Sequence, residues 1–263
     1  MKNLYLITGV IIIGFLSLVA ILAPFISPYD PAMIDQNSLL VGPSLKHLFG
    51  TDSLGRDLFS RIVYGSRISL SIGIIAVGIS VSLGVFLGSL AGFYGKVIDT
   101  LIMRFVDIML CFPTFFLILA VVAVLEPSIF NIMIIIGLTS WMGSARLIRS
   151  EILSLKEREF IQAEKALGAS NSRIIIRHLI PNAIGPVLVN ATLGIAGAIL
   201  LESGLSFLGL GVQPPVPSWG NILIESKATL GIAWWITVFP GFAILFTILG
   251  FYFIAEGLKK IIG

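Results

Sequence analysis

Charged residues are scarce in this chain: Asp, Glu, Lys and Arg make up only 12% of its 263 residues, whereas 57% are hydrophobic. Together with a mean hydropathy of +1.03, this composition excludes a water-soluble globular domain. Cys111 is the single cysteine, so an intrachain disulfide is excluded as well. The net charge is +3, but no basic stripe with interleaved aromatic residues occurs, and nucleic acid is therefore not an expected partner.

Sequence motifs for nucleotide binding, metal binding and metal-dependent hydrolysis are also missing. The sequence contains no G-x-x-x-x-G-K-[ST] loop, so it lacks the usual cradle for the phosphates of ATP. It contains no H-E-x-x-H, and His47 has no Cys, His, Asp or Glu around it at metal-ligand spacing. We therefore predict that the chain is not an enzyme, holds no metal and binds no cofactor of its own.

What the chain has is apolar runs, and a helix needs about 20 such residues to cross a bilayer. They predict an all-α membrane protein with six transmembrane helices in a single domain, 1–263. The domain divides into a first transmembrane helix (1–26), an outer segment (27–67) and a five-helix core (68–263). A cleaved signal peptide is the alternative for the first run, but no clean small-x-small site follows it, which favours a retained anchor. The predicted spans are Leu4–Ala23, Ile68–Gly92, Phe105–Leu125, Ile129–Leu147, Ala183–Leu201 and Ile232–Ala255.

Three glycines in the second span, Gly84, Gly88 and Gly92, recur every four residues and so share one helix face. Such a face permits close helix packing in lipid. In the third span, we expect Pro113 to kink the helix. We expect Asp107 to snorkel or to pair with Arg104 rather than to relay protons.

The outer half of the chain carries further candidates. Glu202, near the outer end of the fifth span, is either a residue of the substrate pathway or a structural cap. The sequence 126–128 predicts a tight outer turn, and the prolines and Gly211 in 207–220 preclude regular helix there. The tryptophans are expected to form an interfacial aromatic belt. This expectation concerns three of the four tryptophans, Trp219, Trp234 and Trp235.

The segment Glu151–Pro181 is the most densely charged part of the chain. Its apolar residues, from Ile152 to Leu167, have the spacing of an amphipathic helix, and Gly168 follows where a helix stop is expected. Ser170 or Asn171 then caps a second short helix. Pro181 either ends this short helix or begins the next one. A rigid helix–glycine–helix element between two spans suits docking to a partner better than catalysis.

The residues 162–168, followed after nine residues by His178-Leu179-Ile180-Pro181, resemble the cytoplasmic coupling loop of permease subunits in bacterial-type ABC importers. That motif is written EAA, three residues, Gly, nine residues, an apolar residue and Pro. Here Gln162 replaces the usual Glu and Glu164 replaces the second Ala, so an ion pair made by the usual Glu is lost. The resemblance implies ATPase coupling for Gln162, Ala163, Glu164, Lys165, Ala166, Leu167, Gly168, Ala169, Ile180 and Pro181.

Two outer segments, 47–67 and 207–220, resemble the C-type permease of the dipeptide, oligopeptide and nickel importer family. By this resemblance, the first segment packs on a partner permease and meets the substrate-binding protein. The alternative from the residues is a self-capped amphipathic helix that lies on the membrane surface. The residues assigned to docking are Gly50, Thr51, Asp52, Gly55, Arg56 and Asp57.

The distribution of basic residues tests the orientation. With six spans and the N-terminus inside, twelve of the 17 Lys and Arg residues fall on the cytoplasmic side and five outside. The positive-inside rule therefore predicts cytoplasmic N- and C-termini and a cytoplasmic coupling loop.

The resemblance implies a type I ABC importer permease fold in the bacterial inner membrane. It implies one half of a pathway for di- or oligopeptides, with a nickel or nickel-chelate importer as the alternative. The implied partners are a second permease, two ATP-binding subunits that hold ATP and Mg²⁺, a substrate-binding protein and membrane lipids. A self-sufficient secondary transporter is a different reading, but it predicts more charges within the spans and internal repeats.

Overall fold

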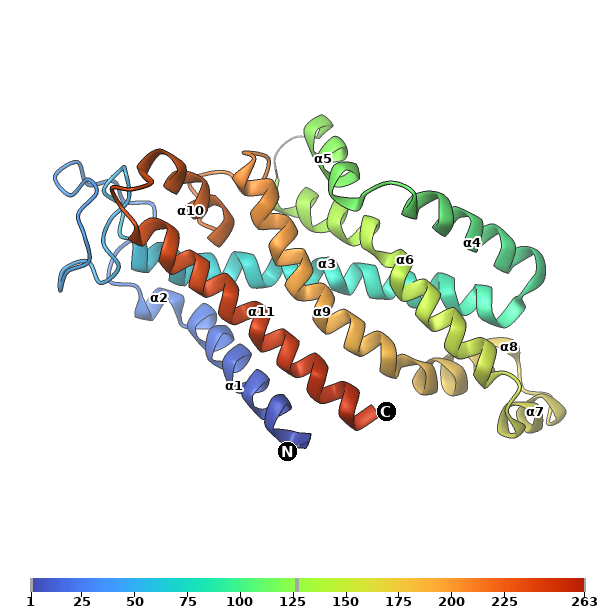
Figure 1. The fold of residues 1–263 in the computed structure, drawn as a ribbon. Helices are drawn as coiled ribbons and strands as arrows, with labels where there is room; N and C mark the ends of the chain where they lie inside the picture. The colour runs from blue at the N-terminus through green and yellow to red at the C-terminus, as the bar shows by residue number, and fades with distance from the viewer. Residues whose placement is uncertain (1, 126–127, 263) are drawn as a thin grey trace.

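The computed structural model describes residues 2–125 and 128–262, and within them the chain is helical, with no β-strand. The long helices lie side by side in an elongated bundle, with the loop 27–57 at one end and α7 at the other (Figure 1). The turn predicted at Glu126–Pro127 lies outside the described residues. The helices are α1 (Lys2–Ile21), α2 (Ala23–Ile26), α3 (Leu58–Tyr94), α4 (Lys96–Leu110), α5 (Thr114–Val124), α6 (Ile129–Leu155), α7 (Glu159–Ala166), α8 (Asn171–Arg173), the π-helix η1 (Ile174–Leu179), α9 (Ile180–Phe207), α10 (Trp219–Glu225), the 3₁₀-helix η2 (Ser226–Thr229) and α11 (Trp235–Ile262).

Five of the helical stretches are long and apolar enough to cross a membrane. A sixth span results if α4 and α5 are taken together, although they meet at an angle of 84°. The predicted all-α membrane fold is therefore confirmed. The five stretches are Leu4–Ile21, Leu58–Tyr94, Ile129–Leu155, Asn171–Phe207 and Trp235–Ile261.

The third span differs from the prediction of one kinked helix over Phe105–Leu125. The helix begins earlier, at Lys96, and it breaks completely between Leu110 and Thr114. Pro113 has an extended backbone there, with φ −60° and ψ 117°, and serves as the N-cap residue of α5. Because proline lacks an N–H and disfavours helical backbone in the residue before it, the break falls at this position.

The two acidic residues of α4, Asp99 and Asp107, pair with arginines of α6. Arg149 Nη2 lies 2.6 Å from Asp99 Oδ2, and Arg146 Nη2 lies 2.6 Å from Asp107 Oδ1. The predicted pairing of Asp107 with Arg104 is therefore wrong. The facing helix supplies the guanidinium, which sequence spacing along α4 alone could not indicate.

The other long helices extend beyond their apolar runs. α6 continues to Leu155 rather than Leu147, α9 runs over Ile180–Phe207, and α11 runs over Trp235–Ile262. Hydropathy detects only the part of a helix that suits lipid, whereas backbone hydrogen bonding continues into the polar end residues.

The outer segment is shorter than predicted. Its last ten residues belong to α3, which begins at Leu58 after the N-cap residue Asp57. The carboxylate of Asp57 accepts a hydrogen bond of 2.8 Å from the Ser60 N–H, which fixes the start of the helix. No helix occurs between Ser27 and Asp57, so the alternative of an amphipathic surface helix is wrong.

The glycine face of α3 packs against α6. A Cβ atom added to Gly84 would lie 2.5 Å from Ser144 Cβ, and one added to Gly88 would lie 2.9 Å from Ala145 Cα. At Gly92 it would lie 3.0 Å from the carbonyl oxygen of Arg149. The two backbones approach each other as closely as small residues allow, which joins these helices over much of their length.

The first helix packs along the last one. A Cβ atom added to Gly9 of α1 would lie 2.7 Å from the Gly250 carbonyl oxygen, and one added to Gly257 of α11 would lie 2.6 Å from Leu6 Cβ. The contact runs along both helices, which lie next to each other in Figure 1. Small residues thus let α1 and α11 pack closely along their length.

Candidate functional site

The loop between α6 and α9 ends its first helix by local rules. Gly168 has a φ of +76°, which suits glycine alone among common residues. Its N–H donates to the Lys165 carbonyl and the Ala169 N–H donates to the Glu164 carbonyl, each at 3.0 Å. These two bonds form a Schellman motif and satisfy carbonyls that the helix end leaves free.

The second half of this loop is continuous with α9. Ser170 Oγ accepts a hydrogen bond from the Arg173 N–H at 3.4 Å, as the predicted cap requires. The π-helix η1 follows without a break, and Ile180 and Pro181 stand in the first turn of α9. Of the two alternatives for Pro181, it begins the next helix.

α7 is held on the bundle by one apolar side chain that the sequence analysis missed. Ile161 is completely buried and packs in one cluster with Ile148 and Ile152 of α6 and with Ile174 and Leu179 of η1. Ile161 is the only β-branched aliphatic residue between Lys156 and Ala169, a signal that could have identified it.

The apolar face that the sequence predicted for α7 points away from the bundle. Phe160 is 44% exposed and Leu167 is 84% exposed, and Ala163 and Ala166 are exposed as well. We call these four residues the α7 outer face. It leaves apolar surface uncovered at the very end of the molecule, which is typical of an interaction site.

The two unusual residues of the predicted motif bond within the loop. Gln162 Nε2 donates to the Lys156 carbonyl at 2.9 Å, so the amide bridges the turn between α6 and α7. Glu164 Oε1 lies 3.5 Å from His178 Nε2, between α7 and η1. Both contacts tie α7 to the neighbouring helices, while Lys165 remains exposed.

The opposite end of the bundle holds a buried charge cluster. Asp52 is completely buried and its carboxylate pairs with Arg56, at 2.7 Å, and with Arg61. Glu225 of α10 lies 2.8 Å from Arg56 Nη2 and 2.5 Å from Arg61 Nη1. Two acids and two bases, which we call the outer charge cluster, thus connect the loop 27–57 with α3 and α10.

A second acid in this loop is also internal. Asp57 Oδ1 lies 2.9 Å from His47 Nδ1, and both residues are buried. His47 is therefore held by a carboxylate in the protein. Nearby, the half-buried Asp35 accepts hydrogen bonds from Ser38 Oγ and the Asn37 N–H, which lower the pKa of its carboxyl.

Two of the three glycines of this loop, Gly50 and Gly55, lie close against neighbouring backbone. Gly50 and Gly55 have φ values of +78° and +76°. A Cβ atom on Gly50 would lie 2.7 Å from the Val41 carbonyl oxygen, and one on Gly55 would overlap the backbone of Asp35. Thr51 is buried between them in the chain, and its Oγ1 donates to the Ser38 carbonyl.

The six residues assigned to docking are thus buried inside this chain. A buried side chain presents no surface to a partner, so Gly50, Thr51, Asp52, Gly55, Arg56 and Asp57 shape the loop rather than form its contact surface. The prediction missed Arg61 and Glu225, because Glu225 is 169 residues from Arg56 and its pairing depends on the fold.

Two of the three predicted belt tryptophans are also internal. Trp219 is 1% exposed and its Nε1 donates to the Ile62 carbonyl at 3.1 Å. Trp235 is 8% exposed and donates to the Thr51 carbonyl at 3.0 Å. Only Trp234, at 56% exposure, is placed as a belt residue would be, so the prediction is wrong for the other two.

Glu202 connects α9 with α10. It is completely buried, and its Oε1 accepts hydrogen bonds from Ser206 Oγ at 2.7 Å and Ser218 Oγ at 2.8 Å. Ser218 also caps α10, in a reciprocal pair of bonds with Asn221. Its other oxygen, Oε2, is buried without a hydrogen-bond partner, so both alternatives for Glu202 stay open. Among the described residues, no cluster of His, Cys, Asp and Glu could hold a metal ion.

Comparison with known proteins gives two family matches. Residues 84–263 match the model of the binding-protein-dependent transport system inner membrane component. Residues 1–43 match the N-terminal transmembrane domain of oligopeptide transport permease C.

Among individual relatives, the dipeptide transport system permease protein DppC of Alkalihalophilus pseudofirmus is 47% identical over 98% of this chain and 85% of its own length. The oligopeptide transport system permease protein OppC of Haemophilus influenzae is 40% identical, over 98% of this chain and 84% of its own. The glutathione transport system permease protein GsiD of Escherichia coli is 43% identical over 96% of this chain and 84% of its own.

The fold resembles that of a solved importer. A chain of the inward-facing MetNI methionine ABC transporter aligns with a TM-score of 0.57 and 18% identity, over 78% of this chain and 96% of that one. At this identity the likeness concerns the fold alone.

Proposed function

This chain belongs to the family of binding-protein-dependent transport system inner membrane components, and from that membership we propose that it forms half of an ATP-driven import pathway for di- or oligopeptides. The observation that carries the proposal is the α7 outer face: apolar, exposed and fixed at one end of the bundle. Work from ATP reaches the chain there, from ATPase subunits that it does not itself contain.

The way α7 is attached explains how force passes to the spans. Ile161 packs α7 against the end of α6 and against η1, and η1 runs directly into α9. A displacement of α7 therefore moves the ends of two spans together, whereas a flexible loop would absorb it. Such a lever is suited to switch a bundle between two packed arrangements.

The chain is a multi-pass membrane protein, and we assign α7 and both termini to the cytoplasm. The excess of Lys and Arg on that side supports the assignment. The loop 27–57, at the other end of the bundle, then faces outward, toward a substrate-binding protein (Figure 1). The complete importer contains a second permease and two ATPase subunits that bind ATP and Mg²⁺.

Peptide is the cargo that the relatives support. The named relatives carry dipeptides, oligopeptides and glutathione, which is itself a tripeptide. The nickel alternative is not favoured, because none of the three relatives described above is named for nickel transport.

The test uses the chain assembled with its permease, ATPase and binding-protein partners in proteoliposomes. We expect ATP-dependent uptake of dialanine or glutathione by the unmodified complex. Leu167→Asp places a charge on the α7 outer face and should reduce uptake and substrate-stimulated ATPase activity at least tenfold, because a charge is desolvated in the contact. Leu167 is 84% exposed, so the variant should still fold.

The matched control is Ser154→Asp, which adds the same charge at an exposed position in the last turn of α6. It should keep nearly full uptake. Equal activity of the two variants would contradict the assignment of α7 as the contact for the ATPase.

A further inference from the structure

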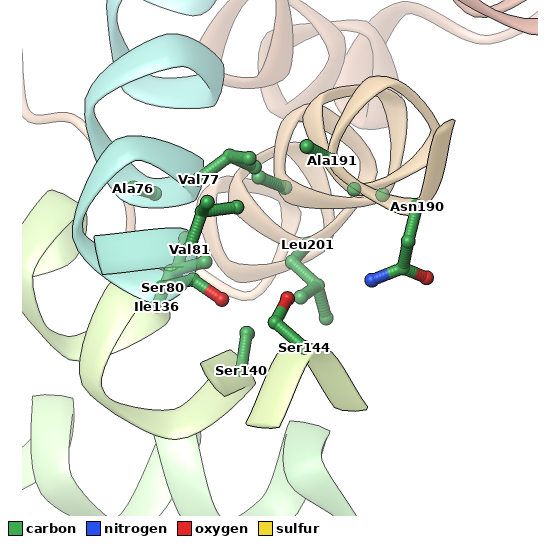
Figure 2. Close-up of a pocket in the computed structure, with 13 residues that line it drawn as sticks. Ala76, Val77, Ser80, Val81, Ile136, Ser140, Ser144, Asn190, Ala191 and Leu201 are labelled. Carbon is green, nitrogen blue, oxygen red and sulfur yellow. The ribbon is translucent and has the colours of Figure 1, made fainter. Parts of the chain in front are cut away.

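A cavity lies between α3, α6 and α9, near the middle of all three helices (Figure 2). Its volume is about 180 Å³, room for several water molecules. Ser80 of α3, Ser140 and Ser144 of α6 and Asn190 of α9 contribute its polar groups. Ser80 and Ser144 are 5% and 2% exposed, whereas Ser140 and Asn190 are exposed at its mouth.

These hydroxyls differ from others in the same helices. Ser89 of α3, Thr139 of α6 and Thr192 of α9 each donate to a backbone carbonyl of the preceding turn, at 2.7–2.9 Å. This bond is the usual way for a hydroxyl to be satisfied in a membrane helix.

The polar side chains of the cavity lack such partners. In the part of the chain that the structure describes, Ser80, Ser140, Ser144 and Asn190 form no side-chain hydrogen bond. Figure 2 shows the Ser80 and Ser144 oxygens directed into the space between the helices, and Asn190 projecting on the same side. Lipid could not satisfy these groups, so they require water or a polar ligand.

The chemistry of the cavity selects among ligands. None of its lining residues is Asp, Glu, Lys, Arg or His, so it offers no counter-charge to an ion or to a charged peptide terminus. Hydroxyl and carboxamide groups each donate and accept, which matches the N–H and C=O groups of a peptide backbone. The remaining lining residues are small or aliphatic, among them Gly194 and Gly197.

We propose that this cavity is a binding position on the translocation pathway, where Ser80, Ser144 and Asn190 hydrogen-bond the backbone amides of the peptide in transit. The proposal rests on the import function above and adds the residues that the cargo meets within the membrane. Neutral hydrogen bonds hold the backbone whatever the side chains are. They are also weak enough to release it.

The first test measures whether a water-soluble reagent reaches the cavity. In a Cys111→Ser background, which removes the single native cysteine, Ser140→Cys and Asn190→Cys are introduced in the assembled transporter. A charged, membrane-impermeant methanethiosulfonate reacts with thiolate, which forms only in contact with water. We expect rapid modification during ATP turnover, slowed by excess dialanine or glutathione, whichever the unmodified complex imports.

Leu138→Cys is the control, since Leu138 is 47% exposed on α6 but does not line the cavity. It should react at least tenfold more slowly. Rates at Ser140→Cys and Asn190→Cys no higher than at Leu138→Cys would overturn the proposal, because lipid or a partner helix would then cover the cavity.

The second test is transport. Ser80→Ala and Ser144→Ala should each lower the number of peptides imported per ATP hydrolysed about fivefold, the effect of one lost hydrogen bond. Ser89→Ala and Thr139→Val, whose hydroxyls bond their own helix, should not. If the unmodified complex imports neither peptide, the proposed function fails. If it imports one and all four variants equal it, only the cavity assignment fails.

Discussion

The two ends of the bundle differ in whether the residues that resemble known motifs are exposed or buried. At the α7 end, most of the residues that resemble a known motif are exposed, and the buried Ile161 lies outside the pattern of its predicted face. At the loop end, Gly50, Thr51, Asp52, Gly55, Arg56 and Asp57 are all buried, and Asp52 and Arg56 belong to the outer charge cluster within the chain's own fold. A recognisable motif is thus exposed surface in one region and buried structure in the other.

This difference predicts that substitutions at the loop end lower stability, whereas substitutions at the α7 end lower transport. Arg61→Met should have the largest effect on stability, because it leaves buried Asp52 and Glu225 with Arg56 as their only charged partner. Breaking a buried ion pair costs about 3–5 kcal/mol. We expect a large fall in the melting temperature of the purified protein in detergent, measured by tryptophan fluorescence.

Lys46→Met removes an exposed positive charge from the same loop and serves as the control. It should change the melting temperature little. If Arg61→Met melted like Lys46→Met, the outer charge cluster would not be a scaffold and the contrast between the two ends would disappear.

An intermediate effect is expected in the helices that connect the ends. Gly88→Leu forces a side chain against the Ala145 backbone, and overpacking costs about 1–3 kcal/mol. Gly78→Leu changes the same residue type in the same helix where an added Cβ atom meets nothing within 4 Å. Thermal melting should separate the two variants, and equal melting would show that the close packing of α3 on α6 is not required.

The smallest effect on stability is expected at the α7 outer face. Leu167→Asp should change the free energy of unfolding by no more than about 0.5 kcal/mol, since exposed positions without special contacts tolerate substitution. The same variant should lose coupled transport. A protein destabilised by this change would indicate that Leu167 supports the fold, as the residues of the outer charge cluster do.

Local rules predicted the end of α7 and the start of the next helix, but not the break at residues 156–158, which divides the helical spacing of Ile152–Leu167 between α6 and α7. The turn at Gly168, the Ser170 cap and the role of Pro181 all depend on the conformations that glycine, serine and proline adopt or exclude. Which face of α7 is buried does not follow from such rules. It depends on the ends of α6 and η1, which cover Ile161 and leave Leu167 exposed.

At the loop end, the sequence singled out the six residues assigned to docking but did not indicate that they are buried. Whether Asp52 or Arg56 is exposed depends on Arg61 and on the distant Glu225, and no local pattern indicates that they meet. Likewise, hydropathy located the spans but not the break at Pro113 into two helices 84° apart. Both features depend on tertiary structure, which the periodicity of the sequence does not indicate.

The contact between the α7 outer face and an ATPase subunit is tested most directly by cross-linking. In the Cys111→Ser background, Ala163→Cys is combined with single cysteines on the surface of the ATPase subunit, and a short thiol cross-linker is added to inside-out vesicles. The account predicts a covalent product of this chain with the ATPase subunit, and no such product for Ser154→Cys. A product with the substrate-binding protein instead, or labelling of Ala163→Cys only from outside intact cells, would contradict it.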